Sequence, residues 1–130
     1  MKLSTLLAAN AVLAFAYAAG MLFMPATLLA NYGMSVGTSE KMTAQFFGVA
    51  LVFVGLVTWF TRNISDRATQ RALVLALLIY DTIGVVVSVM GTLNGSMNAA
   101  GWSAVALYAV LGLAAAYFQF GKSSTTQALT

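Results

Sequence analysis

The chain has 130 residues, of which 61% are hydrophobic and 7% are charged, and its net charge is +3. Soluble domains are about 45–50% apolar and about 25% charged, so we expect an integral membrane protein whose partner is the lipid bilayer. The sequence has no His, no Cys and three acidic residues, which excludes disulfides and removes most ligands of metal and haem centres. We therefore predict a non-enzymatic protein with no catalytic residue, metal, cofactor or nucleic-acid partner.

Four apolar windows without Lys or Arg are long enough to cross a membrane, since a bilayer core of about 30 Å needs about 20 apolar helical residues. They cover residues 3–24, 42–60, 72–90 and 102–120. These windows predict an all-α protein, an antiparallel four-helix bundle forming a single transmembrane domain over residues 1–121, with a polar cytoplasmic tail at 122–130. A cleavable signal peptide is the alternative interpretation of the first window, but its apolar run continues past the small-residue pattern at 16–18.

Turn and cap residues are expected between the windows. Pro25 fits the first turn of a short surface helix over residues 26–32, which Gly33 can end. Ser39 and Ser65 are each followed by an acidic residue, and this pattern predicts that they are the N-caps of the second and third spans.

The basic residues predict the orientation in the membrane, because cytoplasmic flanks carry the excess of Lys and Arg. Five of them lie at the chain ends and in the middle connection, and only one lies on the other side: Lys2, Arg62, Arg67, Arg71 and Lys122 against Lys41. We therefore expect a multi-pass protein with both termini in the cytoplasm.

Small and aromatic residues predict how the helices pack. Helices in lipid approach one another through small residues, and such residues recur on one face of each window. The expected helix-packing positions are Gly48, Gly55, Gly84, Ser88 and Gly112. Aromatic residues near the window ends are expected in the membrane interface, namely Tyr32, Trp59, Trp102 and Tyr117.

Asp81 is the exceptional residue, since it lies roughly ten residues, or about 15 Å, beyond Arg71 and so near the bilayer midplane. Acidic side chains at that depth usually face the bundle interior and have a partner or a function. Asn10 and Tyr108 lie at similar estimated depths, and we expect the three to form an intramembrane polar cluster. Either Asp81 is a protonated hydrogen-bonding group that ties helices together, or it binds a proton, an ion or a ligand.

The order of several short motifs resembles a known group of proteins. They are Pro25 after the first window, residues 47–51 and Trp59-Phe60 in the second, Tyr80-Asp81 in the third and Gly101-Trp102 at the start of the fourth. This layout resembles small bacterial four-span membrane proteins of unknown function and is similar to that of the DoxX-like proteins, although their charged, glycine-rich first-helix signature is missing. The resemblance implies a bacterial inner (plasma) membrane location and no established activity.

Three functions are compatible with these patterns. The first is an accessory or structural subunit that packs into a homo-oligomer or a larger membrane complex. The second is a small transporter or channel that uses Asp81 as its proton or ion site. The third is a membrane protein that binds a lipid, a quinone or a pigment without an axial His.

Overall fold

The computed structural model describes residues 2–121, and in this part of the chain the regular structure is helical. The elements are α1 (Leu3–Phe23), α2 (Pro25–Ala30), α3 (Thr38–Phe60), α4 (Arg67–Leu93) and α5 (Gly101–Phe120). Four of them, α1, α3, α4 and α5, are long and apolar enough to cross a membrane. The prediction of an all-α membrane bundle is confirmed, whereas the predicted tail at 122–130 lies outside the described residues.

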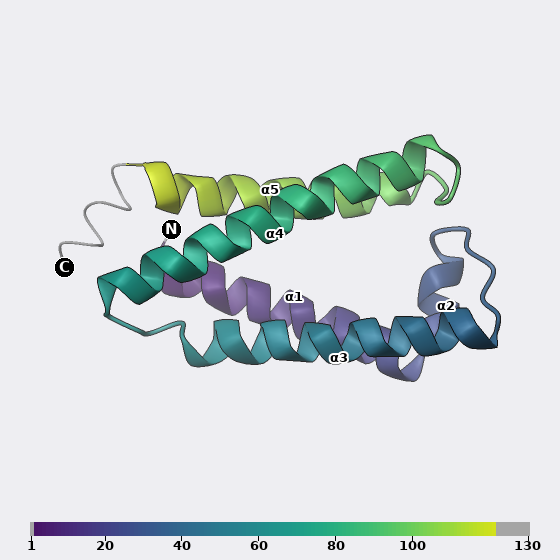
Figure 1. The fold of residues 1–130 in the computed structure, drawn as a ribbon, viewed down its shortest axis with the longest axis horizontal. Helices are drawn as coiled ribbons and strands as arrows, with labels where there is room; N and C mark the ends of the chain where they lie inside the picture. The colour runs from purple at the N-terminus through teal and green to yellow at the C-terminus, as the bar shows by residue number, and fades with distance from the viewer. Residues whose placement is uncertain (1, 122–130) are drawn as a thin grey trace.

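The long helices form antiparallel neighbours that are joined into two pairs (Figure 1). α1 packs along α3, and α4 packs along α5. The pairs meet through a narrower contact between α1 and α5, while the described parts of α3 and α4 share no comparable contact. Below, the terminal end of the bundle is where α1 begins and α5 ends, and the loop end is where α2 and the α4–α5 connection lie (Figure 1).

Glycines on α3 allow the close approach of α1. A Cβ atom added at Gly48 would lie 3.2 Å from the backbone oxygen of Ala18, and one added at Gly55 would lie 2.6 Å from the ring of Phe15. Both glycines are buried. They therefore act as packing positions, as close helix approach in lipid requires.

Glycines on both helices of the second pair have the same role. A Cβ atom at Gly84 would collide with the ring of Tyr108, and one at Gly112 would lie 3.3 Å from the Cβ atom of Asp81. Ser88 is 5% exposed on the same helix as Asp81. The α4–α5 interface is thus built around a tyrosine ring and a carboxylic side chain.

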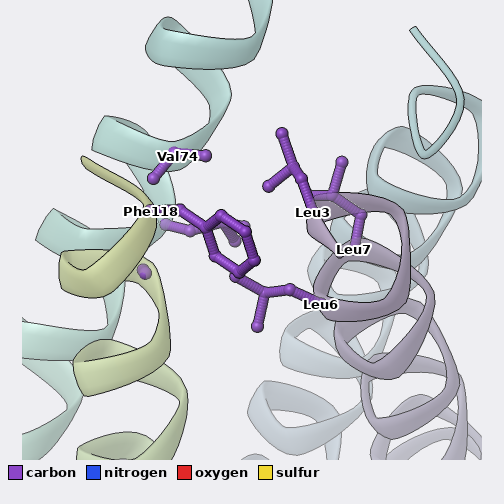
Figure 2. Packing of buried hydrophobic residues seen from close by; sticks show 7 residues of the cluster. Leu3, Leu6, Leu7, Val74 and Phe118 are labelled. Atoms are coloured by element: carbon purple, nitrogen blue, oxygen red, sulfur yellow. The ribbon is translucent and has the colours of Figure 1, made fainter. Parts of the chain in front are cut away.

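The two pairs are held together at the terminal end by an apolar cluster. Its buried members come from three helices, Leu3, Leu6 and Leu7 on α1, Val74 and Leu77 on α4, and Ala115 and Phe118 on α5. Figure 2 shows the ring of Phe118 directed from α5 toward Leu6 and Leu7. Dispersion contacts among these side chains, together with the exclusion of lipid or water, stabilise the junction between the two helix pairs.

Two of the predicted N-caps are wrong by one or two residues. α3 begins at Thr38, because Gly37 takes the extended backbone conformation of an N-cap. Ser39 therefore lies inside the helix and does not cap it. α4 is capped by Asp66 itself, whose carboxylate accepts a hydrogen bond from the backbone N–H of Thr69 at 2.9 Å. A carboxylate is as good an N-cap acceptor as a serine hydroxyl, so Ser65 stays outside the helix.

The short surface helix exists but is displaced toward the N-terminus. It starts at Pro25, in agreement with the expected first-turn position, and ends at Ala30 rather than at residue 32. Gly33 follows with a φ of +76°, a left-handed conformation that glycine adopts without strain. This turn directs the chain across the loop end of the bundle toward α3.

Candidate functional site

Asp81 lies near the middle of the 27-residue helix α4, and its side chain is fully buried, with 0% exposure. Neither carboxyl oxygen has a hydrogen-bond partner within the described residues. Among the described residues, Oε1 of Gln119 is also buried without a hydrogen-bond partner, and it lies nearer the terminal end. An unpaired buried polar group costs about 1–3 kcal/mol, so the position of Asp81 calls for an explanation.

The two residues that the sequence grouped with Asp81 lie near it but do not bond to it. Asn10 is 5% exposed on α1, and its side-chain amide donates to the backbone oxygen of Leu6 at 3.1 Å. Tyr108 on α5 packs its ring edge-on against Tyr80, with the ring centroids 5.9 Å apart. Asn10 therefore satisfies its donor within its own helix, and the Asp81 carboxyl makes no direct interhelical tie.

What Asp81, Asn10 and Tyr108 share is a cavity of about 290 Å³ between the helix pairs. All four long helices contribute to its walls, and Ser88 lines it as well. Most of the lining is apolar, including Leu13, Ala14, Met21, Leu51, Val54, Ala104, Leu107 and Leu111. Among the described residues that line the cavity, Asp81 is the only acidic one, and none is Lys or Arg.

Four tyrosines line the same cavity, and sequence reasoning grouped only one of them with Asp81. Tyr80 lies beside Tyr108, whereas Tyr17 and Tyr32 place their hydroxyl oxygens 3.3 Å apart. Tyr32, which was expected in the membrane interface, also forms part of this wall. The missed signal was the position of Tyr17 on α1, three residues after Ala14 and seven after Asn10, since residues three, four and seven apart share a helix face.

Contacts between elements flank the cavity at both ends of the bundle. Toward the terminal end, its walls give way to the apolar cluster formed by α1, α4 and α5. Toward the loop end, the backbone oxygen of Tyr32 accepts a hydrogen bond of 2.8 Å from the backbone N–H of Asn98. The Asn98 side chain also donates to the backbone oxygen of Asn31 at 3.3 Å. These contacts join the segment after α2 to the α4–α5 connection.

Two lining residues also belong to the surface of the bundle. Phe47 on α3 is 42% exposed, and Val87 on α4 is 62% exposed. They come from α3 and α4, and these two helices do not pack closely against each other within the described residues. The cavity therefore approaches the outside along the α3–α4 side, within the membrane-spanning helices rather than at their ends.

Few polar side chains are present in the described lining of the cavity. Within residues 2–121, no group of three or more His, Cys, Asp or Glu residues is arranged to hold a metal ion. Ser88 has no His or other basic side chain beside it in the described lining, so it lacks an activating base. A buried carboxyl group, tyrosine rings and apolar walls remain, which is the composition of small-molecule binding sites.

Comparisons with protein-family models, curated proteins and solved structures found no match to this chain. The resemblance to DoxX-like proteins therefore stays a prediction.

Proposed function

We propose that this chain is a non-enzymatic, multi-pass membrane protein that binds a compact, mostly apolar small molecule between its two helix pairs. The observation that carries the proposal is the cavity of about 290 Å³ whose wall contains the fully buried, unpaired carboxyl group of Asp81. Ligand sites are typically apolar with a few polar groups that fix the ligand's orientation, and they start at about 300 Å³. The carboxyl oxygens of Asp81 are covered, so a ligand would have to displace the covering atoms, and it would then supply the partner that the protein does not.

The size of the cavity restricts the ligand to a compact molecule. A phospholipid with two acyl chains, or a quinone with a long isoprenoid tail, would exceed 290 Å³ and would have to extend out of the bundle. The exposed parts of Phe47 and Val87 offer an apolar route from the bilayer along the α3–α4 side. We infer that the ligand partitions into the membrane first and enters sideways.

A binding role is better supported than conduction through the bundle. A proton or ion path needs polar groups that lead to both membrane surfaces. Here an apolar cluster lies at the terminal end, and the contacts of Asn98 with the segment after α2 lie at the loop end. An accessory role in a homo-oligomer or a larger complex stays a prediction, which the size of the detergent-purified particle would test.

The location remains part of the proposal. The four apolar helices support a membrane protein, and the basic residues near the terminal end support cytoplasmic termini by the positive-inside rule. The bacterial inner membrane rests on the family resemblance alone.

A filled cavity tests the binding role. Ala104 lines the cavity on α5, whereas Ala106 on the same helix is exposed and does not line it. The wild type, Ala104→Phe and Ala106→Phe proteins would be purified in one detergent and extracted with organic solvent, and the retained small molecules would be quantified by mass spectrometry. We expect a compact species retained by the wild type and by Ala106→Phe but reduced about tenfold in Ala104→Phe. Equal content in all three proteins would exclude this site.

A further inference from the structure

The cavity contains one carboxyl group, and this group favours a positively charged ligand. Asp81 is 0% exposed and both its oxygens lack partners within the described residues, and no Lys or Arg lies in the described cavity wall. A carboxylate in such a setting needs an opposite charge close by, because desolvation of an unpaired ion is strongly unfavourable. The protein brings no such charge to the cavity, so a ligand is left to bring it.

The aromatic walls favour the same sign of charge. Tyr80 precedes Asp81 in the chain and packs edge-on against Tyr108, and both rings line the cavity together with Tyr17 and Tyr32. The faces of aromatic rings are negative and attract ammonium groups, most strongly where water is excluded. Tyrosine rings and one carboxylate together make a site for a cation that is weakly hydrated and bulky.

We propose that the cavity binds a compact, lipophilic organic cation, such as a quaternary or tertiary amine, with the Asp81 carboxylate as its counter-ion and tyrosine rings around its charged group. This inference rests on the proposed function and specifies its ligand class. The apolar residues Leu51, Val54 and Leu111 receive the hydrocarbon part, while the charge lies beside α4. A neutral ligand that merely accepts a hydrogen bond from a protonated Asp81 is the competing outcome.

Two probes of the same shape separate these outcomes. Phenyltrimethylammonium carries a positive nitrogen where tert-butylbenzene carries a neutral carbon, and both are compact enough for a cavity of about 290 Å³. Binding of each probe to the full-length protein in nanodiscs would be measured by equilibrium dialysis, with the uptake by empty nanodiscs subtracted. We expect the wild type to bind phenyltrimethylammonium at least about tenfold more tightly, since an ion pair with added cation–π contacts exceeds 1.4 kcal/mol.

Asp81→Asn provides the matched variant, because it keeps the shape of the side chain and removes its charge. We expect its affinity for phenyltrimethylammonium to fall about tenfold while its affinity for tert-butylbenzene is unchanged. Should the variant not fold, the comparison of the two probes on the wild type still decides. Ala106→Phe, which alters the exposed side of α5, should bind both probes as the wild type does.

Each adverse result has a distinct meaning. If the wild type binds both probes equally, or binds tert-butylbenzene more tightly, the cationic ligand class is wrong and the binding cavity stands. If Asp81→Asn keeps the preference for the cation, Asp81 is not the counter-ion and the inference is likewise overturned. If neither probe binds above empty nanodiscs, and Ala104→Phe also retains as much co-purified material as the wild type, the proposed function fails with it.

Discussion

The Cβ atom of Asp81 on α4 faces Gly112 on α5 so closely that a Cβ atom added to the glycine would lie 3.3 Å away. A larger residue at Gly112 would push against the one acidic side chain within the bundle. The close approach of α4 and α5 and the burial of the carboxyl group are therefore consequences of the same contact. One turn further along α4, Gly84 makes room for the ring of Tyr108 in the same way.

Alanine substitutions at the two glycines of the α4–α5 interface should differ in how much they lower the free energy of unfolding. Gly84→Ala places a methyl group in collision with the ring of Tyr108, whereas Gly112→Ala makes a tight but less severe contact with Asp81. We expect Gly84→Ala to lower the free energy of unfolding by about 1–3 kcal/mol, as overpacking does, and Gly112→Ala to lower it less. Unfolding by a denaturing detergent, followed by circular dichroism, measures both. A more stable Gly84→Ala protein would show that the ring is free to move aside.

Asp81→Leu should stabilise the ligand-free protein. The substitution removes a buried carboxyl group that has no hydrogen-bond partner within the described residues, and the new side chain can extend into the apolar cavity. Relief of an unsatisfied polar group is worth about 1–3 kcal/mol, so we expect a higher melting temperature in detergent. Asp81→Asn serves as the control, because it keeps a polar group and should melt near the wild type. Destabilisation by Leu alone would instead support a polar tie between helices.

Asp66 should make the start of α4 sensitive to acid. Hydrogen bonds from the Thr69 side chain and backbone hold the pKa of Asp66 below its usual value of 3.8. Because the pKa is lower in the folded protein, the stabilisation is complete above about pH 3.8 and is lost as the pH falls below that value. Asp66→Asn keeps an N-cap acceptor that does not titrate. We expect the wild type to lose stability relative to this variant on acidification, and a constant difference would contradict the capping role.

The orientation can be tested with single thiols, since the chain has no cysteine of its own. Ser96 in the α4–α5 connection and Ser65 in the α3–α4 connection are both exposed, at opposite ends of the bundle. We expect Ser96→Cys to react with a membrane-impermeant maleimide in intact cells and Ser65→Cys to react only after permeabilisation. The reverse pattern would place the termini outside.

Local properties of the sequence were sufficient for the helices and for the depth of Asp81. Length and hydropathy predicted the four spans, because the bilayer thickness fixes how many apolar residues a helix needs. Counting residues at about 1.5 Å each placed Asp81 near the middle of α4. The glycines were recognisable because helices in lipid approach through small residues. Each of these inferences uses only the residues of a single helix and needs no knowledge of how the helices pack.

The cavity and the state of Asp81 were decided by the tertiary structure. Depth along a helix follows from the chain, but the rotation of each helix and its distance from the others follow from how all the side chains pack. Asn10 has the right depth, yet its amide bonds to Leu6 of its own helix rather than to Asp81. Tyr32 lines the cavity because the turn at Gly33 folds the segment after α2 over the loop end. A cavity is the space that packing leaves between helices, so no single helix specifies it.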